Sequence, residues 1–411
     1  MATNVHPLSR LIAACEPGSP ADLGVYVSRE QPVAQRLFQA VQPARRMCAL
    51  LVGQTGVGKS TELHRITGGI SFGSRQGGLY AGGSPSKHCI PIDEFLDLDI
   101  ATWHDVLVFS ACFLANRFSQ AHDPSPSEDY LDLELALRPQ VIRAAQQHMD
   151  GGPPEPTPMQ RFRNSFRQVH DTIELGRSQF WDMAVAVLAS GFHFDEFLLI
   201  WDGLEKMSLA SARRLFGDEG QYLRQLPFRV IVTAPLGLTF DESFGQIEEH
   251  FSYVERLRAV SVEPGGGGER FCMELLSRRG ASAVCSDELL KRAISLCGGV
   301  PRQLLQIISY AAKQALSDGQ DQITPESLAR AGNQLAGKWQ YQLGPKDYEA
   351  LDKADEDREP AERARLLQLG ACIEHDSPDG GLQIDVNPLV LLLMQKRAAR
   401  AAERKGQRGQ G

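Results

Sequence analysis

Three glycines, a lysine and a serine at fixed spacing form the part of this sequence whose residue types most plainly carry chemistry. The segment reads Gly53-Gln54-Thr55-Gly56-Val57-Gly58-Lys59-Ser60, and Thr61 follows it. A glycine-rich turn lets successive backbone N–H groups converge on a phosphate, and a helix that begins there adds its partial positive charge. In such a loop the lysine reaches the β- and γ-phosphates, and the serine hydroxyl binds magnesium. This segment, called here the phosphate-binding loop, therefore predicts a site for ATP and Mg²⁺.

The apolar runs around the loop predict the elements that position it. Residues 47–52 form a buried strand before the loop and residues 61–66 a helix after it, which is the context that the motif requires. A second run, 197–201, is typical of a buried parallel strand, and it closes with Asp202. An acid at the end of a neighbouring strand holds Mg²⁺ through water. Ser60 and Asp202 are therefore the predicted magnesium ligands.

Hydrolysis of ATP also needs a group that orients or deprotonates water. Gly203 occupies the position after Asp202, where many ATPases with this loop carry a catalytic glutamate. Glu205 is the nearest substitute, although a carboxylate there is equally explained by the partial charge of a helix N-terminus. Thr233 ends a further apolar run and is a candidate sensor of the γ-phosphate, or simply a residue that strands favour. The site is thus predicted without its standard base.

Arginines farther along the chain are candidates for contact with the phosphates. Arg302 follows Gly298-Gly299-Val300-Pro301, and a proline at a helix start fixes φ and places the next side chain on the first turn. From there the arginine can fold back on the phosphates, and the alternative is a solvated surface residue. Arg256 and Arg258 precede or open the last candidate strand. Either is a candidate arginine finger that reaches the site of a neighbouring subunit.

Composition limits the classes of function. The chain has 411 residues, too many for one ordinary core, and its 42% apolar and 23% charged content is typical of a globular protein. A net charge of -8 argues against wholesale phosphate binding by a basic surface and leaves a local nucleic-acid patch open. The cysteines stand singly without zinc spacing, and no apolar run is long enough for a membrane span or signal peptide. We expect a cytoplasmic protein without a membrane segment.

The order of predicted elements divides the chain into five parts. We expect a flexible leader (1–22), an α/β nucleotide domain (23–264) with a helical insertion at about 123–160, a helical lid domain (265–340), a winged-helix-like domain (341–397) and a disordered basic tail (398–411). The clearest linker is the glycine run 264–268. Alternating strands and helices favour a parallel sheet covered on both faces. Helices followed by two short strand-like runs around an Asp379-Gly380-Gly381 turn favour a winged helix.

Taken in order, these motifs resemble those of the AAA+/STAND group of P-loop ATPases, nearest to its origin-recognition-like members. The resemblance covers about residues 23–395. It rests on the phosphate-binding loop, the strand end Leu198-Leu199-Ile200-Trp201-Asp202-Gly203-Leu204-Glu205, Thr233-Ala234-Pro235, Gly298-Gly299-Val300-Pro301-Arg302 and the terminal winged helix. It implies a parallel-sheet P-loop domain and a helical lid with ATP bound between them. In such proteins the bound nucleotide, ATP or ADP, sets the angle of the lid and the state of assembly. The resemblance further implies that Lys59 and Ser60 bind phosphate and magnesium, that Asp202 is the Walker B acid, that Thr233 is sensor 1 and that Arg302 is sensor 2.

The leading interpretation is a slow regulatory ATPase that assembles into homo-oligomers and controls a partner effector protein. Gly203 lowers the expected turnover, and bacterial members of this group often serve antiviral defence or transposition. The alternative is a DNA-binding loader or regulator that reads a duplex with its winged helix. The basic run 395–400, with Arg404 and Lys405 beyond it, favours DNA, whereas the acidic stretch 346–363 opposes it. A binding-only pseudo-ATPase and a kinase are lesser alternatives.

Overall fold

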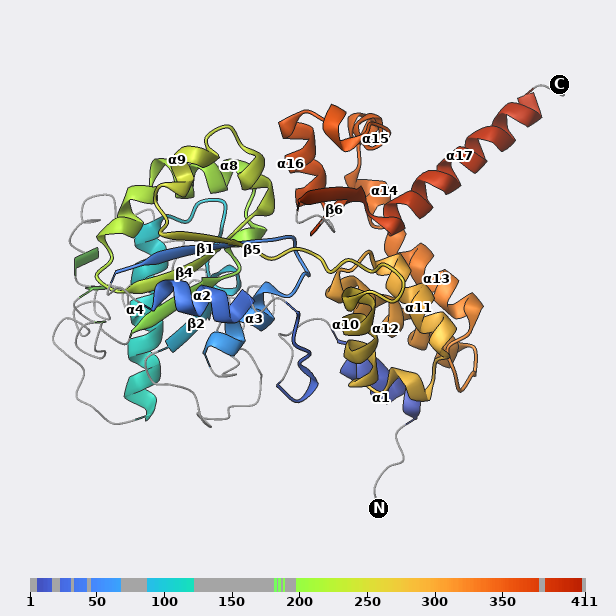
Figure 1. The fold of residues 1–411 in the computed structure, drawn as a ribbon, viewed down its shortest axis with the longest axis horizontal. Coiled ribbons are helices and arrows are strands. Elements are labelled where there is room, and N and C mark those ends of the chain that lie inside the picture. The colour runs from blue at the N-terminus through green and yellow to red at the C-terminus, as the bar shows by residue number, and fades with distance from the viewer. Residues whose placement is uncertain are drawn as a thin grey trace, which may run out of the picture.

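Figure 1 shows a part built around a sheet, a helical part beside it and a C-terminal part that contacts both. The computed structural model describes residues 6–16, 23–30, 33–42, 46–67, 87–121, 181–182, 184–185, 188, 197–376 and 381–408. The helical insertion that the sequence predicts at about 123–160, and the connection 68–86, lie outside these described residues.

The sheet of the first part has five parallel strands in the described residues. They are β1 (Cys48–Val52), β2 (Lys87–Pro91), β3 (Leu198–Asp202), β4 (Arg229–Ala234) and β5 (Tyr253–Arg256). Their order in space is β2-β3-β4-β1-β5, and every neighbouring pair is parallel. The predicted α/β class with a parallel sheet is confirmed. Because the strands are parallel, the chain leaves β1, β2, β3 and β4 at one edge, which brings residues far apart in the sequence together.

Helices cover both faces of this sheet because strand side chains alternate between the faces. The covering helices are α2 (Val33–Val41), α3 (Lys59–Ile66) and α4 (Trp103–Ala121). In β1, Ala49 and Leu51 belong to the apolar cluster of α2 and α3, whereas Leu50 and Val52 belong to that of α4. Every residue of β1 and β3 is buried. The residues that flank the phosphate-binding loop therefore lie on rigid elements.

Short helical turns follow the strands at the carboxyl edge. They are η2 (Ile92–Glu94) after β2, η4 (Leu204–Lys206), α8 (Leu209–Ala212), the π-helical η5 (Arg213–Asp218) and η6 (Gly220–Gln225) after β3, and η7 (Leu236–Phe240) and α9 (Phe244–Glu248) after β4. The sequence predicts one continuous helix over 209–223. Gly217 and Gly220 fall inside that stretch, and each glycine lowers helix stability by about 1 kcal/mol relative to alanine. The stretch accordingly forms three short segments.

The helical part contains α10 (Gly267–Ser277), η8 (Ala281–Ala283), α11 (Asp287–Cys297), α12 (Pro301–Ser317) and α13 (Pro325–Ala336), together with α1 (Pro7–Ala14) and η1 (Leu23–Val25) from the chain's beginning. Helix α1 packs against α12 and buries Leu8 and Leu11. Residues 7–14 therefore correct the expectation of a flexible leader, since the two leucines lie three apart on one helix face. Helix α10 likewise begins inside the glycine run that the sequence predicts as a linker.

The C-terminal part contains α14 (Trp339–Gln342), α15 (Pro345–Leu351), η9 (Asp355–Asp357), α16 (Pro360–Gln368), β6 (Cys372–Asp376), β7 (Leu382–Val386) and α17 (Pro388–Arg408). Strands β6 and β7 form an antiparallel hairpin, which gives the helix–helix–hairpin–helix order of the predicted winged helix. Helix α17 projects outward in Figure 1 and runs to Arg408, where the sequence predicts a disordered tail from 398. The alanines and arginines of this stretch are strong helix formers, which explains the difference. None of the helices in the described ranges has the length and apolar character to cross a membrane.

Candidate functional site

The phosphate-binding loop connects β1 to α3 at the carboxyl edge of the sheet. Gly56 and Gly58 have φ angles of 92° and 107°, which residues with a Cβ rarely adopt. Gly58 is also the residue directly before α3. The loop therefore takes the turn that its glycines predict, and it leads into a helix N-terminus that stabilises an anion.

Lys59 is the buried cation of this loop. Its Nζ donates hydrogen bonds to the carbonyls of Gly53 at 2.8 Å and Gln54 at 3.0 Å, and it lies 3.6 Å from Glu205 Oε1. Burial lowers the pKa of Lys59, the negative charges of Glu205 and Asp202 oppose that change, and the guanidinium of Arg302 adds to it. An ammonium bound to neutral carbonyls gains a stronger, charged acceptor when a phosphate enters. The surroundings of Lys59 therefore fit a phosphate group.

Asp202, the last residue of β3, lies beside the start of α3. Its Oδ1 accepts from the backbone N–H of Gly203 at 2.9 Å, and the Ser60 hydroxyl lies close enough to lower the pKa of the Asp202 carboxyl. Burial, followed by the charge of Glu205, raises the pKa of Asp202 to about 6. The predicted magnesium ligands Ser60 and Asp202 are thus adjacent. Because no group of three potential His, Cys, Asp or Glu ligands occurs among the described residues, Mg²⁺ here would depend on phosphate oxygens and water as well.

Glu205 lines the pocket beside Lys59, whereas Thr233 does not line it. Glu205, in η4, is buried, and its Oε2 has no hydrogen-bond partner among the described residues. Burial by itself would raise the pKa of Glu205, but the charges of Lys59 and Lys206 together with hydrogen bonds outweigh burial, and the pKa is lowered. Thr233 is fully buried, and its Oγ1 accepts from the Leu204 N–H at 3.1 Å. Thr233 therefore ties the end of β4 to the turn that carries Glu205.

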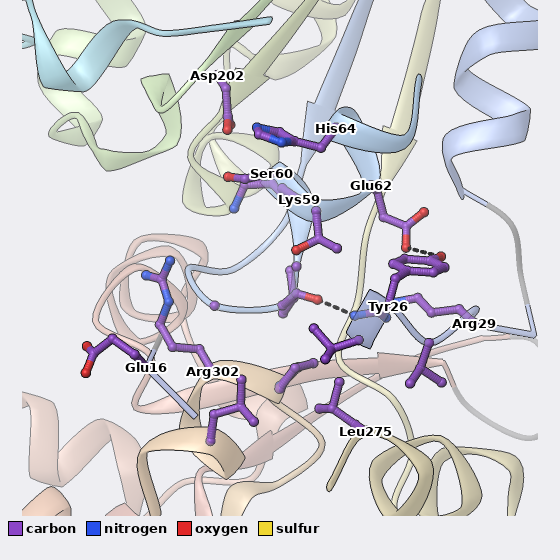
Figure 2. Close-up of a pocket in the computed structure, with 18 of the residues that line it drawn as sticks. Glu16, Tyr26, Arg29, Lys59, Ser60, Glu62, His64, Asp202, Leu275 and Arg302 are labelled. Atoms are coloured by element: carbon purple, nitrogen blue, oxygen red, sulfur yellow. Dashed lines mark hydrogen bonds between the residues drawn. The ribbon is translucent and has the colours of Figure 1, made fainter. Parts of the chain in front are cut away.

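Arg302 reaches the loop from the helical part. It lies in the first turn of α12, and its backbone N–H donates to the Gly56 carbonyl at 3.1 Å. A Cβ built on Gly56 would lie 2.8 Å from Arg302 Cβ, so glycine at 56 also permits this close approach. The Arg302 side chain lines the same pocket as Lys59, Ser60 and Asp202 (Figure 2). The sequence placed these residues at one site, and the fold brings them together.

Arg256 lies away from this pocket in the described structure. Its Nη1 is 3.5 Å from Glu374 Oε1 in β6, and its guanidinium lies 5.9 Å from the centroid of the Phe240 ring. Arg258 also pairs with Glu374, at 2.9 Å, and with Asp376. Both candidate arginine fingers are therefore engaged with the C-terminal hairpin of their own chain.

A segment at 23–29, which the sequence analysis did not assign to the site, forms another wall of the pocket. Val25, Tyr26, Val27 and Arg29 line it together with Leu275 of α10, and the whole pocket encloses about 340 Å³. The Arg29 guanidinium donates to the carbonyls of Val57 and, at 2.9 Å, of Arg258. The sequence gives no motif in this segment that would mark it as part of a site; its one distinguishing feature is the short apolar run at 25–27.

The same segment is held from two sides. On the side of the sheet, Tyr26 donates through its hydroxyl to Glu62 of α3 at 3.1 Å. On the side of the helical part, Arg278 donates to the Tyr26 carbonyl at 2.6 Å and Arg279 to the Val25 carbonyl at 3.3 Å. Segment 23–29 therefore connects the two walls of the pocket.

Gln54 links the phosphate-binding loop to the C-terminal part. Its Nε2 donates to the carbonyls of Leu367 at 3.2 Å and Cys372 at 2.5 Å, and its Oε1 accepts from the Glu374 N–H at 3.3 Å. The Gln54 side chain is buried. Beside it, the Ala259 N–H donates to the Glu374 carbonyl at 3.0 Å. The end of α16 and the start of β6 are therefore hydrogen-bonded directly to the phosphate-binding loop.

Comparisons with known proteins complete the description of the site. No protein-family model matches the sequence, and no curated protein sequence matches it. Similar solved structures include Cdc6p from Pyrobaculum aerophilum, with 12% identity, a TM-score of 0.42 and coverage of 92% of this chain and 95% of that one. The Aeropyrum pernix ORC1 protein in complex with DNA has 12% identity, a TM-score of 0.44 and coverage of 95% and 98%. The Thermotoga maritima RuvB Holliday junction branch migration motor has 12% identity, a TM-score of 0.38 and coverage of 90% and 95%.

Proposed function

We propose that this chain is a regulatory ATPase of the AAA+/STAND kind, which binds ATP with Mg²⁺, hydrolyses it slowly and changes its assembly or its contact with an effector protein accordingly. One observation carries the proposal. The phosphate-binding loop contacts both other parts of the chain, through Gly56 to Arg302 and through Gln54 to Cys372. Any movement of the loop on binding a phosphate therefore acts on the helical part and the C-terminal part together.

Each side chain of the site has a task when nucleotide is bound. The loop N–H groups and Lys59 would hold the β- and γ-phosphates, and Ser60 and Asp202 would hold the magnesium ion, directly or through water. The ion supplies positive charge that offsets charge on the transferring phosphoryl group. Arg302 brings a further positive charge from the helical part, so the γ-phosphate links that part to the sheet. Loss of the γ-phosphate removes this link, which is the basis of the proposed switch.

Slow turnover follows from the acids near the loop. Gly203 supplies no carboxylate, and Glu205 is paired with the cation Lys59. Release of Arg256 from Glu374 would free this arginine to reach a neighbouring subunit. A rearrangement of the C-terminal part would in this way promote assembly. The proposed setting, a defence or mobile-element system with an effector protein, rests on the family resemblance only.

DNA binding is a second candidate function, and one observation favours it. Helix α17 projects from the body of the structure and carries the basic residues Lys396, Arg397, Arg400, Arg404, Lys405 and Arg408. Against it, the second helix of a helix–turn–helix pair is the one that enters a major groove, and α16 instead packs on η7. Its Arg363 and Arg365 pair with Asp355 and Asp347. Retention on duplex DNA that weakens steeply with salt would support this second function.

The deciding experiment measures ATP hydrolysis and solution mass with and without ATP and Mg²⁺. The full chain is compared with Lys59→Ala and Asp202→Ala. The proposal expects ATP-dependent assembly that both substitutions abolish, after which Arg256→Ala and Arg302→Ala locate the contact between subunits. A chain that binds no nucleotide and keeps one mass under all conditions contradicts the proposal.

A further inference from the structure

The position after Asp202 is filled by a carboxylate from the turn that follows another strand. Gly203 has a φ of 91°. A Cβ built on it would lie 1.9 Å from Asp93 Oδ1, 2.7 Å from Asp93 Cγ and 3.0 Å from Asp93 Cβ. No side chain fits at 203 while Asp93 keeps its place. The glutamate that many P-loop ATPases carry at this position is therefore missing from the sequence, but a carboxylate still lies where that side chain would begin.

The register of the sheet places Asp93 there. Strands β2 and β3 are parallel, with Pro91 paired to Asp202, so the residues that follow them leave the sheet side by side. The chain then turns in η2, whose Ile92 is buried and anchors the turn. Asp93 comes to lie next to Gly203, and it lines the pocket that contains Lys59, Ser60 and Asp202. The position of Asp93 is thus fixed by β2 and by a buried anchor.

Lys206 orients the Asp93 carboxylate. The two side chains form an ion pair through Asp93 Oδ2. Burial would lower the pKa of Lys206, but the hydrogen bond and charge of Asp93, together with the charges of Glu205 and Asp202, outweigh burial and raise it. Lys206 therefore stays positively charged, and it holds the carboxylate in one orientation from η4, the turn that also carries Glu205.

The two acids of this region differ in their access to water. The side chain of Asp93 is 17% exposed, whereas that of Glu205 is 7% exposed and pairs with Lys59 at 3.6 Å. Glu205 balances the charge of Lys59, the cation of the phosphate-binding loop. A general base must instead contact both water and the reacting phosphate. Both acids line the pocket, and Asp93, which is the more exposed and is not paired with Lys59, fits that role better.

We propose that Asp93 is the general base of ATP hydrolysis in this chain, supplied from η2, the turn after β2, in place of a residue at 203. The inference rests on the proposed ATPase function. In the step, a water oxygen forms a bond to the γ-phosphorus while the bond between the γ-phosphorus and the bridging oxygen breaks. The bridging oxygen leaves with the electron pair on ADP, and the proton of the water passes to an Asp93 carboxylate oxygen. ADP and inorganic phosphate are the products.

The test measures ATP binding and a single turnover of hydrolysis on the same samples of the full chain. Calorimetric titration with ATP and Mg²⁺ gives the affinity, and release of labelled phosphate from saturating ATP gives the rate constant. Asp93→Asn, which keeps the shape of the side chain, is expected to lower the rate constant by about 100-fold or more with little change in affinity. Glu242→Gln, at an exposed carboxylate between η7 and α9 that does not line the pocket, is the control and is expected to keep the unmodified rate.

A second variant separates the base role from a structural one. Gly203→Ala keeps Asp93 but moves it aside, so it should also lower the rate constant, and its retained ATP affinity reports that the site is folded. Combining it with Asp93→Asn should cause little further loss, because both changes remove the same interaction. Two independent structural defects would instead lower the rate constant by the product of their separate effects.

The outcomes distinguish this inference from the proposed function. If the unmodified chain binds ATP and Asp93→Asn hydrolyses it at the unmodified rate, Asp93 is not the base and the proposed function stands. The same conclusion follows if Glu205→Gln alone stops hydrolysis at unchanged affinity. If the unmodified chain binds ATP without hydrolysing it, the hydrolytic part of the proposed function fails and the inference fails with it. If the unmodified chain does not bind ATP, the proposed function fails and the inference fails with it.

Discussion

The side chain of Gln54, the second residue of the phosphate-binding loop, donates a hydrogen bond to the backbone carbonyl of Cys372, the first residue of β6. These residues are 318 positions apart in the sequence. A single buried amide therefore joins the loop beside the predicted phosphates to the hairpin of the C-terminal part. Because the same amide also accepts from the Glu374 N–H, loop and hairpin cannot move apart without breaking several hydrogen bonds at once.

Gln54→Ala should uncouple the loop from the C-terminal part. The substitution leaves the carbonyls of Leu367 and Cys372 without the donor that they share, which should lower the free energy of unfolding by about 1–3 kcal/mol. Faster hydrogen exchange in β6 is expected, with nucleotide affinity less affected. Denaturant unfolding and exchange mass spectrometry check both. Gln383→Ala, an exposed glutamine in β7, is the control, and equal effects of the two substitutions would contradict the prediction.

Binding of ATP with Mg²⁺ should weaken as pH falls through about 6. Burial and the charge of Glu205 raise the pKa of Asp202 to about 6, so its carboxyl is protonated below that pH and cannot serve magnesium. Affinity should then fall by about tenfold per pH unit. Titrations between pH 5 and pH 8 would show this. Asp202→Asn removes the titrating group, so the difference in pH dependence between the two proteins isolates Asp202 from the titration of ATP itself.

Stability without nucleotide should show the opposite trend over the same range. A carboxyl whose pKa is raised by folding contributes stability that is fully present below its unfolded pKa and is lost as pH rises through the folded value. Between about pH 4 and pH 6, the ligand-free chain should therefore lose the contribution of Asp202. Thermal unfolding of the unmodified chain and of Asp202→Asn across this window checks the sign, and a difference that grows in the other direction would contradict it.

Arg29→Met should weaken both the fold and the nucleotide site. The guanidinium binds the carbonyls of Val57 and Arg258, and methionine keeps the apolar stem but removes both bonds. The expected loss of unfolding free energy is about 2–4 kcal/mol, together with weaker ATP binding, because Val57 lies within the phosphate-binding loop. Arg270→Met is the control, since Arg270 is exposed and pairs only at the surface with Glu30. Near-equal losses in the two variants would argue against a specific role of Arg29.

Glu374→Gln should loosen the hairpin from the sheet. Glu374 is 1% exposed and pairs with Arg256 and Arg258, whose own side chains are partly exposed. Solvent screening at the arginines reduces the expected loss of unfolding free energy to about 1–2 kcal/mol. Asp376→Asn removes the other, exposed partner of Arg258 and should cost less. Denaturant unfolding of both variants would rank them, and the reverse ranking would contradict the prediction.

The sequence predicts well the features that depend on neighbours along the chain. The phosphate-binding loop requires particular glycines, and β3 is a continuous apolar run that ends at Asp202, so both are visible locally. Arg302 was predicted from the proline before it. Such features need no knowledge of distant contacts, because backbone geometry and periodicity determine them.

Tyr26, Arg29 and Asp93 were not predicted as site residues, and the reason is tertiary. Asp93 reaches the site through the register of β2 on β3, and Arg29 does so through carbonyls of Val57 and Arg258. No spacing in the sequence records either relationship. For Arg256 the sequence indicated an intersubunit role, which stays a prediction, and gave no sign of the pairing with Glu374 because those residues come from different parts of the chain.

Segment 23–29 is hydrogen-bonded to different partners on the two sides of the pocket, which affects how the pocket can open. Its carbonyls are bound by Arg278 and Arg279 of the helical part, while Tyr26 and Arg29 bind Glu62 and Val57 on the other side. A rotation of the helical part relative to the sheet must break one of these two sets and keep the other. The segment would then stay attached to one side only, and the pocket would open on the side whose hydrogen bonds break first.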